Sequence, residues 1–82
     1  MDRNKLNILL AAVITTVDEL GEAPEGILYA GLMSQGYTLD QFNVGISLMT
    51  RAGLATSESY LLKLTPAGHA MAAKINTVAN RA

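Results

Sequence analysis

Apolar side chains recur every three or four residues along the first quarter of the chain. The central stripe spans residues 4–20 at helical spacing and consists of Leu6, Leu9, Leu10, Val13, Val17 and Leu20. Further apolar residues widen it beyond one face: Ile8, Ala11, Ala12 and Ile14. The pattern predicts a long helix that is apolar on more than one side. Its second apolar face either packs within its own domain or meets a partner subunit.

A second helix is predicted after a short break. Gly21 ends the first helix, Pro24 suits the first position of the next, and that helix stops before Gly36. Gly26 and Gly31 within it each cost about 1 kcal/mol of helix propensity relative to alanine. We expect the close approach of another helix to be the reason for these glycines.

The third helix has the clearest local signature. Thr38 and Gln41 fit a capping box, and Tyr37 and Phe42 occupy the two positions of a hydrophobic staple. Within a helix of about residues 38–52, one side carries Leu39, Phe42, Ile46 and Met49. The opposite side carries Asp40, Asn43, Val44, Ser47, Thr50 and Arg51. Only residues 35–37 separate this helix from the second, which is the spacing of a helix-turn-helix.

Two short strands and a last helix complete the chain. The strands, at residues 54–56 and 60–64, flank a turn of Ser57-Glu58-Ser59. Alternation in the second strand places Tyr60, Leu62 and Leu64 on one face and Leu61 and Lys63 on the other. Thr65 and Pro66 begin a helix to about residue 80, with an apolar ridge of Met71, Ile75 and Val78. The pattern predicts one domain over residues 1–82 that is mainly helical with a small β-hairpin.

The element order and two local motifs resemble a known family. The run Leu48-x-x-x-x-Gly53-Leu54, followed by Tyr60-Leu61-Leu62-Lys63-Leu64-Thr65-x-x-Gly68, is similar to the winged helix-turn-helix transcription regulators of the MarR and PadR type. The resemblance covers residues 24–73. It implies three helices, a two-stranded wing and a C-terminal helix, with the third helix reading the major groove of DNA.

The resemblance also implies a set of DNA-contacting residues on the third helix and the hairpin: Thr38, Gln41, Asn43, Ser47, Arg51 and Lys63. Asn and Gln side chains pair with adenine, and Arg pairs with guanine or phosphate. Wings of this family usually hold Arg or Lys at the tip, whereas this tip is Ser57-Glu58-Ser59. Because winged helices also bind proteins, an adaptor or accessory subunit without direct DNA binding is the alternative function.

A surplus of apolar residues favours self-association. Half of the 82 residues are apolar and 16% are charged, so apolar side chains remain for an oligomer or partner surface. Regulators of this type usually pair through their terminal helices, and here those helices are rich in apolar residues. We expect a homodimer whose interface includes Ile8, Ala12, Ile14, Met71, Ile75 and Val78.

Composition argues against catalytic and metal chemistry. The chain has no cysteine, so disulfides are excluded and zinc would depend on His69 and carboxylates, which the sequence does not group together. It contains no Ser-His-Asp arrangement, no phosphate-cradling loop and no paired carboxylates in a plausible cleft. We therefore expect a protein that is not an enzyme and uses no cofactor or metal.

Charge is balanced overall but unevenly distributed, with a formal net charge of −1. Residues 17–40 contain no Lys or Arg, and their acids are Asp18, Glu19, Glu22, Glu25 and Asp40. Residues 41–82 carry Arg51, Lys63, Lys74 and Arg81 against a single acid, Glu58. The C-terminal half has a mild positive bias, well below the strongly basic face of many nucleic-acid-binding domains.

The N-terminal apolar run superficially resembles an export signal. Arg3 and Lys5 precede residues 6–17, which are too short to span a bilayer and are followed by acids without an Ala-x-Ala cleavage site. We interpret the run as a buried helix of a soluble, cytoplasmic protein. A signal peptide is the alternative.

Overall fold

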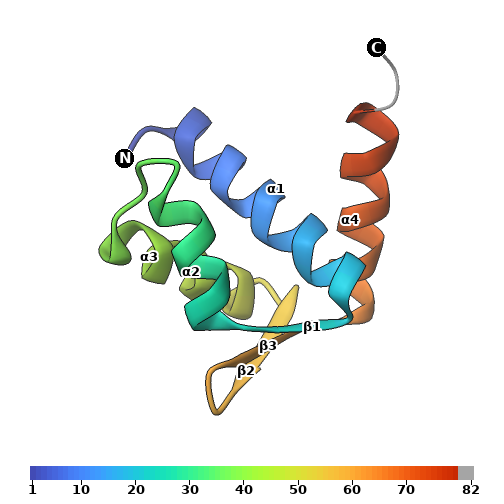
Figure 1. Ribbon diagram of the computed structural model, residues 1–82. Coiled ribbons are helices and arrows are strands. Elements are labelled where there is room, and N and C mark those ends of the chain that lie inside the picture. The colour runs from blue at the N-terminus through green and yellow to red at the C-terminus, as the bar shows by residue number, and fades with distance from the viewer. Residues whose placement is uncertain (80–82) are drawn as a thin grey trace.

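The structure, a computed structural model, describes residues 1–79. In chain order its elements are α1 (Arg3–Leu20), β1 (Glu22–Pro24), α2 (Glu25–Met33), α3 (Leu39–Arg51), β2 (Ala55–Glu58), β3 (Leu61–Leu64) and α4 (Pro66–Ala79). Figure 1 shows α1 running diagonally between the α2–α3 pair on one side and α4 on the other, with the small sheet below. The prediction of a mainly helical fold is confirmed, but the described sheet has three strands where the sequence predicted two.

The strand that the sequence pattern did not predict is β1. It pairs antiparallel with β3, placing Ala23 opposite Leu62 and Pro24 opposite Leu61, so that β3 is the central strand of the order β1-β3-β2. Pro24 is therefore extended (φ −61°, ψ 134°) and α2 begins only at Glu25, which corrects the prediction that Pro24 opens the helix. Extended backbone here buries Ala23 against the core, and proline is tolerated because β1 is an edge strand.

The turn of the β2–β3 hairpin also differs from the prediction. Glu58 pairs with Leu61, so the turn consists of Ser59 and Tyr60, whose φ angles are 50° and 62°. Two left-handed residues in a two-residue turn match the twist of the flanking strands. Tyr60 is 81% exposed at the tip and does not share the inner face of β3 with Leu62, as the alternation had suggested.

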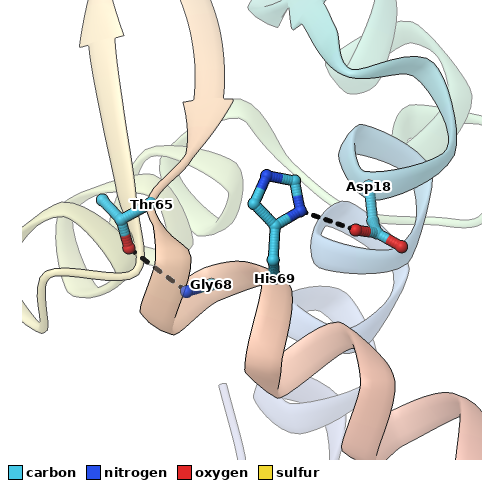
Figure 2. A network of polar contacts seen from close by, with 4 residues as sticks. All are labelled: Asp18, Thr65, Gly68 and His69. Carbon is cyan, nitrogen blue, oxygen red and sulfur yellow. Dashed lines mark hydrogen bonds and ion pairs between the residues drawn. The ribbon is translucent and has the colours of Figure 1, made fainter.

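Local signals at the starts of α3 and α4 are confirmed. The Thr38 hydroxyl accepts a hydrogen bond from the Gln41 N–H at 3.1 Å, and the Gln41 side chain accepts one from the Thr38 N–H at 3.0 Å, which completes the capping box. Thr65 caps α4 by accepting from the Gly68 N–H at 3.2 Å (Figure 2). Its hydroxyl also donates to the carbonyl of Gly53, which ties α4 to the end of α3.

One polar contact joins the two terminal helices. Figure 2 shows His69 on α4 pointing towards Asp18 on α1, with 2.7 Å between the imidazole Nδ1 and a carboxylate oxygen. The histidine side chain is half exposed. The contact shows which side of α1 faces α4.

Two glycines mark the closest packing, and they are not the two that the sequence suggested. A Cβ at Gly26 or Gly31 would meet nothing within 4 Å, so close helix packing does not explain either residue. A Cβ at Gly45 of α3 would instead overlap the Leu9 side chain of α1, and one at Gly68 would overlap the carbonyl oxygen of Leu54. The tightest contacts therefore lie between α1 and α3 and at the start of α4.

The core collects apolar side chains from every helix and from the sheet. Its largest fully buried members are Phe42, Leu9, Met49, Leu62, Val13 and Val17. The Phe42 ring lies 5.7 Å from that of Tyr29 at an interplanar angle of 52°, so it links α3 to α2. No polar or charged residue of the described chain is buried. This core holds α3 with one side inward and leaves its opposite side at the surface.

Candidate nucleic-acid interface

The outer side of α3 forms a shallow, open surface. It is lined by Asp40, Asn43, Val44, Ser47, Leu48 and Arg51. Asn43 and Arg51 are exposed and Ser47 is half-buried, while Phe42, Gly45, Ile46 and Met49 of the same helix are buried. The helical period thus places the predicted polar residues outward, as expected. That they contact DNA remains a prediction.

Charge on this surface is sparse. Arg51 lies in the last turn of α3 and Asp40 in the first, positions where each charge also complements the helix dipole. Within residues 1–79 Lys63 pairs with Glu22 and His69 contacts Asp18, so Arg51 has no acidic partner there. It is the cation on this surface that is free to meet an anionic ligand.

Three of the six predicted contact residues are engaged inside the chain. Thr38 and Gln41 hold each other in the capping box, and the Lys63 ammonium lies 3.3 Å from the Glu22 carboxylate. The Lys63 pair forms because β1 places Glu22 directly opposite Lys63 in the sheet. Asn43, Ser47 and Arg51 remain as the predicted residues without such an engagement among the described residues.

The hairpin adds little positive charge. Its exposed acid Glu58 lies at the end of β2 beside the Ser59-Tyr60 turn, and the Ser57 hydroxyl donates a hydrogen bond to the Glu25 carboxylate. The Glu25 N–H in turn donates to the Tyr60 carbonyl at 2.8 Å. These contacts tie the hairpin to the start of α2. The tip of the hairpin, Ser59 and Tyr60, carries no basic side chain.

Apolar side chains interrupt the polar residues of the α3 surface. Val44 is 48% exposed and Leu48, one turn further along, is 39% exposed. Val44 was predicted to point outward, whereas no surface role was predicted for Leu48. The signal for Leu48 was its position four residues after Val44, which puts both on one side of a helix. Such side chains can contact thymine methyl groups or apolar residues of a protein.

The structure separates the residues predicted to form a dimer interface. Ile8, Met71 and Val78 are exposed, whereas Ala12 and Ile75 are half-buried. Ile14 is only 3% exposed and belongs to the core, which corrects its assignment to an interface. Ile14 is buried because it lies one turn before Asp18, on the same side of α1. The contact between Asp18 and His69 shows that this side faces α4 of the same chain.

Residues 1–79 contain no group of three or more His, Asp or Glu side chains placed to hold a metal ion. None of the helices described is long and apolar enough to cross a membrane.

The candidate site is therefore one face of α3 with two polar side chains, two exposed apolar ones, one acid and one cation: Asn43, Ser47, Val44, Leu48, Asp40 and Arg51. Its interpretation depends on this geometry alone. Comparisons with protein-family models, with curated proteins and with solved structures found no match to the chain.

Proposed function

We propose that this chain is a small winged helix-turn-helix DNA-binding domain that acts as a dimeric transcription regulator. The observation that supports it best is the outer face of α3, where Asn43, Ser47 and Arg51 make no side-chain contact that would occupy them within the described residues. In this proposal α2 and α3 form the helix-turn-helix, and α3 enters the major groove. The β2–β3 hairpin is the wing, and β1 adds a third strand to it.

Four outward residues of α3 have a role in the proposed complex. Asn43 pairs with adenine, Arg51 pairs with guanine or a phosphate, and Val44 contacts the methyl group of thymine. Asp40 repels phosphates and therefore restricts how the start of α3 approaches the backbone. Because one protomer offers so few free cations, a dimer supplies the second set of contacts that specific binding requires.

Single alanine substitutions at Arg51 and Asn43 are expected to affect DNA binding differently, the first its affinity and the second its sequence preference. In a selection from genomic DNA at two salt concentrations, Arg51→Ala is expected to weaken binding by about 1–3 kcal/mol and to lower its salt dependence if the contact is a phosphate. Asn43→Ala is expected to relax the preference at one base pair. Lys74→Ala removes the same charge from exposed α4 and is the matched control, with little expected effect. Absence of binding at low salt, or equal binding by all variants, would contradict the proposal.

A second function, protein binding without DNA contact, is supported by a different observation. Val44 and Leu48 give the middle of the α3 surface an exposed apolar centre, and the Lys63 ammonium is paired with the Glu22 carboxylate. Apolar centres with polar rims are typical of protein interfaces. If α3 binds a protein, Val44→Ser should abolish capture of that partner while Arg51→Ala has a smaller effect, the reverse of the order expected for DNA.

A further inference from the structure

The tip of the β2–β3 hairpin has a backbone conformation that its two residues disfavour. Ser59 and Tyr60 both lie in the left-handed region, with φ angles of 50° and 62°. Glycine and asparagine usually occupy such turns, because a bulky side chain is crowded by the backbone there. A tyrosine at this position therefore lowers the stability of the fold unless its side chain makes a compensating contact.

The Tyr60 side chain makes no such contact within residues 1–79. It is 81% exposed, and the aromatic contacts in this part of the chain involve Tyr29, Phe42 and Tyr37 instead. Among the same residues, the tyrosine hydroxyl that makes a hydrogen bond is that of Tyr37. The Tyr60 ring thus adds no contact that would offset the cost of its backbone conformation.

The turn is held in this conformation from the start of α2. The Glu25 N–H donates to the Tyr60 carbonyl at 2.8 Å, and the Ser57 hydroxyl donates to the Glu25 carboxylate. Strand pairing of Glu58 with Leu61 closes the turn from the other side. Figure 1 shows the hairpin extending away from the helices. The exposed Tyr60 ring is therefore carried by a backbone that is fixed relative to α2.

The charge beside this ring indicates what it can contact. Glu58, two positions before Tyr60, is exposed and has no cationic partner among residues 1–79. The cation of the hairpin, Lys63, is paired with Glu22 of β1. A free carboxylate beside an exposed aromatic ring repels the phosphates of DNA. The same pair of groups suits an arginine side chain, whose guanidinium stacks on aromatic faces and pairs with carboxylates.

We propose that Tyr60 and Glu58 bind an arginine side chain of a partner protein, with the guanidinium over the Tyr60 ring and beside the Glu58 carboxylate. The proposal goes beyond DNA binding by α3 and does not depend on it, because the hairpin tip and the outer face of α3 have no residue in common. A contact outside the protomer also accounts for a tyrosine in a turn that favours glycine or asparagine.

Two substitutions separate the strain of the turn from the contact made by the ring. Tyr60→Asn and Ser59→Asn each introduce a residue that tolerates left-handed backbone, and both are expected to raise the urea midpoint of unfolding. Only Tyr60→Asn removes the ring, so Ser59→Asn is the matched control for binding. A lower midpoint for Tyr60→Asn would overturn the proposal, because the ring would then stabilise the protomer itself.

NMR titration of the full chain with an acetylated and amidated Gly-Gly-Arg-Gly-Gly peptide measures the contact. The ring resonances of Tyr60 are expected to shift and saturate in the wild type and in Ser59→Asn. The dissociation constant, followed on the backbone amides of residues 57–61, is expected to rise at least about threefold in Tyr60→Asn and in Glu58→Gln. The same peptide with citrulline, which has nearly the shape of arginine without its charge, should not bind.

Absence of saturable binding by the wild type, equal binding of the citrulline peptide, or unchanged affinity in Tyr60→Asn would each show that the tip does not recognise a guanidinium. A DNA duplex at low salt is the remaining arm of the experiment. If it shifts the Tyr60 ring resonances and Tyr60→Asn weakens its binding, the tip belongs to the DNA interface and the proposal is wrong. Because the peptide titration contains no DNA, its result stands even if the α3 variants show that DNA is not bound.

Discussion

Replacing Gly68 with alanine is expected to lower the free energy of unfolding by about 3 kcal/mol, near the upper end for overpacking. The added Cβ would overlap the carbonyl oxygen of Leu54 and lie 3.1 Å from the Cβ of Leu64. The Leu54 carbonyl cannot simply retreat, because it accepts a hydrogen bond from the Thr65 N–H at 3.0 Å. The start of α4 must therefore move away from the end of α3. The gain in helix propensity, about 1 kcal/mol, offsets only part of this cost.

Urea unfolding followed by circular dichroism measures this effect as a lower midpoint at an unchanged slope. Gly26→Ala is the matched control, since it makes the same change in the first turn of α2 where the new Cβ meets nothing. That variant should be as stable as the wild type or slightly more stable. Equal midpoints for the two variants would show that α4 does not begin as close to Leu54 as described.

Phe42→Ala is expected to have the largest effect among core substitutions, about 3–5 kcal/mol. Phe42 is 2% exposed, packs against the Tyr29 ring and connects α3 with α2. A domain of 82 residues has a total stability of about 4–12 kcal/mol, so this loss removes much of it. The α2–α3 pair should lose its fixed geometry before the rest of the chain does.

Thermal unfolding provides the measurement, and Leu39→Ala on the same helix provides the control. Leu39 is 51% exposed, so its truncation creates no cavity and should cost less than about 1 kcal/mol. Similar melting temperatures for the two variants would mean that Phe42 does not anchor α3. Phe42→Leu, which keeps most of the buried volume, should fall between them.

The features predicted correctly from the sequence are those set by neighbouring residues. Thr38 and Gln41 form the capping box because the two partners lie three positions apart, and no distant contact is needed. The same holds for Thr65 at the start of α4. The helical period also placed Asn43 and Arg51 outward, because the opposite side of α3 is decisively apolar.

Features that depend on distant residues could not be predicted in this way. β1 has only three residues, one of them a proline, and it is a strand only because β3, some forty positions later, supplies its hydrogen-bonding partner. The turn at Ser59 and Tyr60 contains neither the glycine nor the asparagine that usually marks two left-handed residues.

The prediction of the candidate site was affected by β1 too, because the sequence pattern did not reveal this strand. Without β1, nothing in the sequence places Glu22 beside Lys63, so Lys63 was predicted to be free for DNA. Ile14 was assigned to an interface because the sequence shows that α1 has two apolar faces but not which neighbour covers the second. Ile14 lies on the side of α1 that faces α4 of the same chain.

The pairing of β1 with β3 has a consequence for how the domain is completed during synthesis. These strands lie on either side of the segment that contains α2 and α3, and they join its two ends (Figure 1). The segment is therefore a closed loop, and the direction in which α3 faces is fixed from both sides. Until residues 61–64 have left the ribosome, a nascent chain can form its first three helices but cannot close that loop. The orientation of α3 is thus fixed only after β3 has been made.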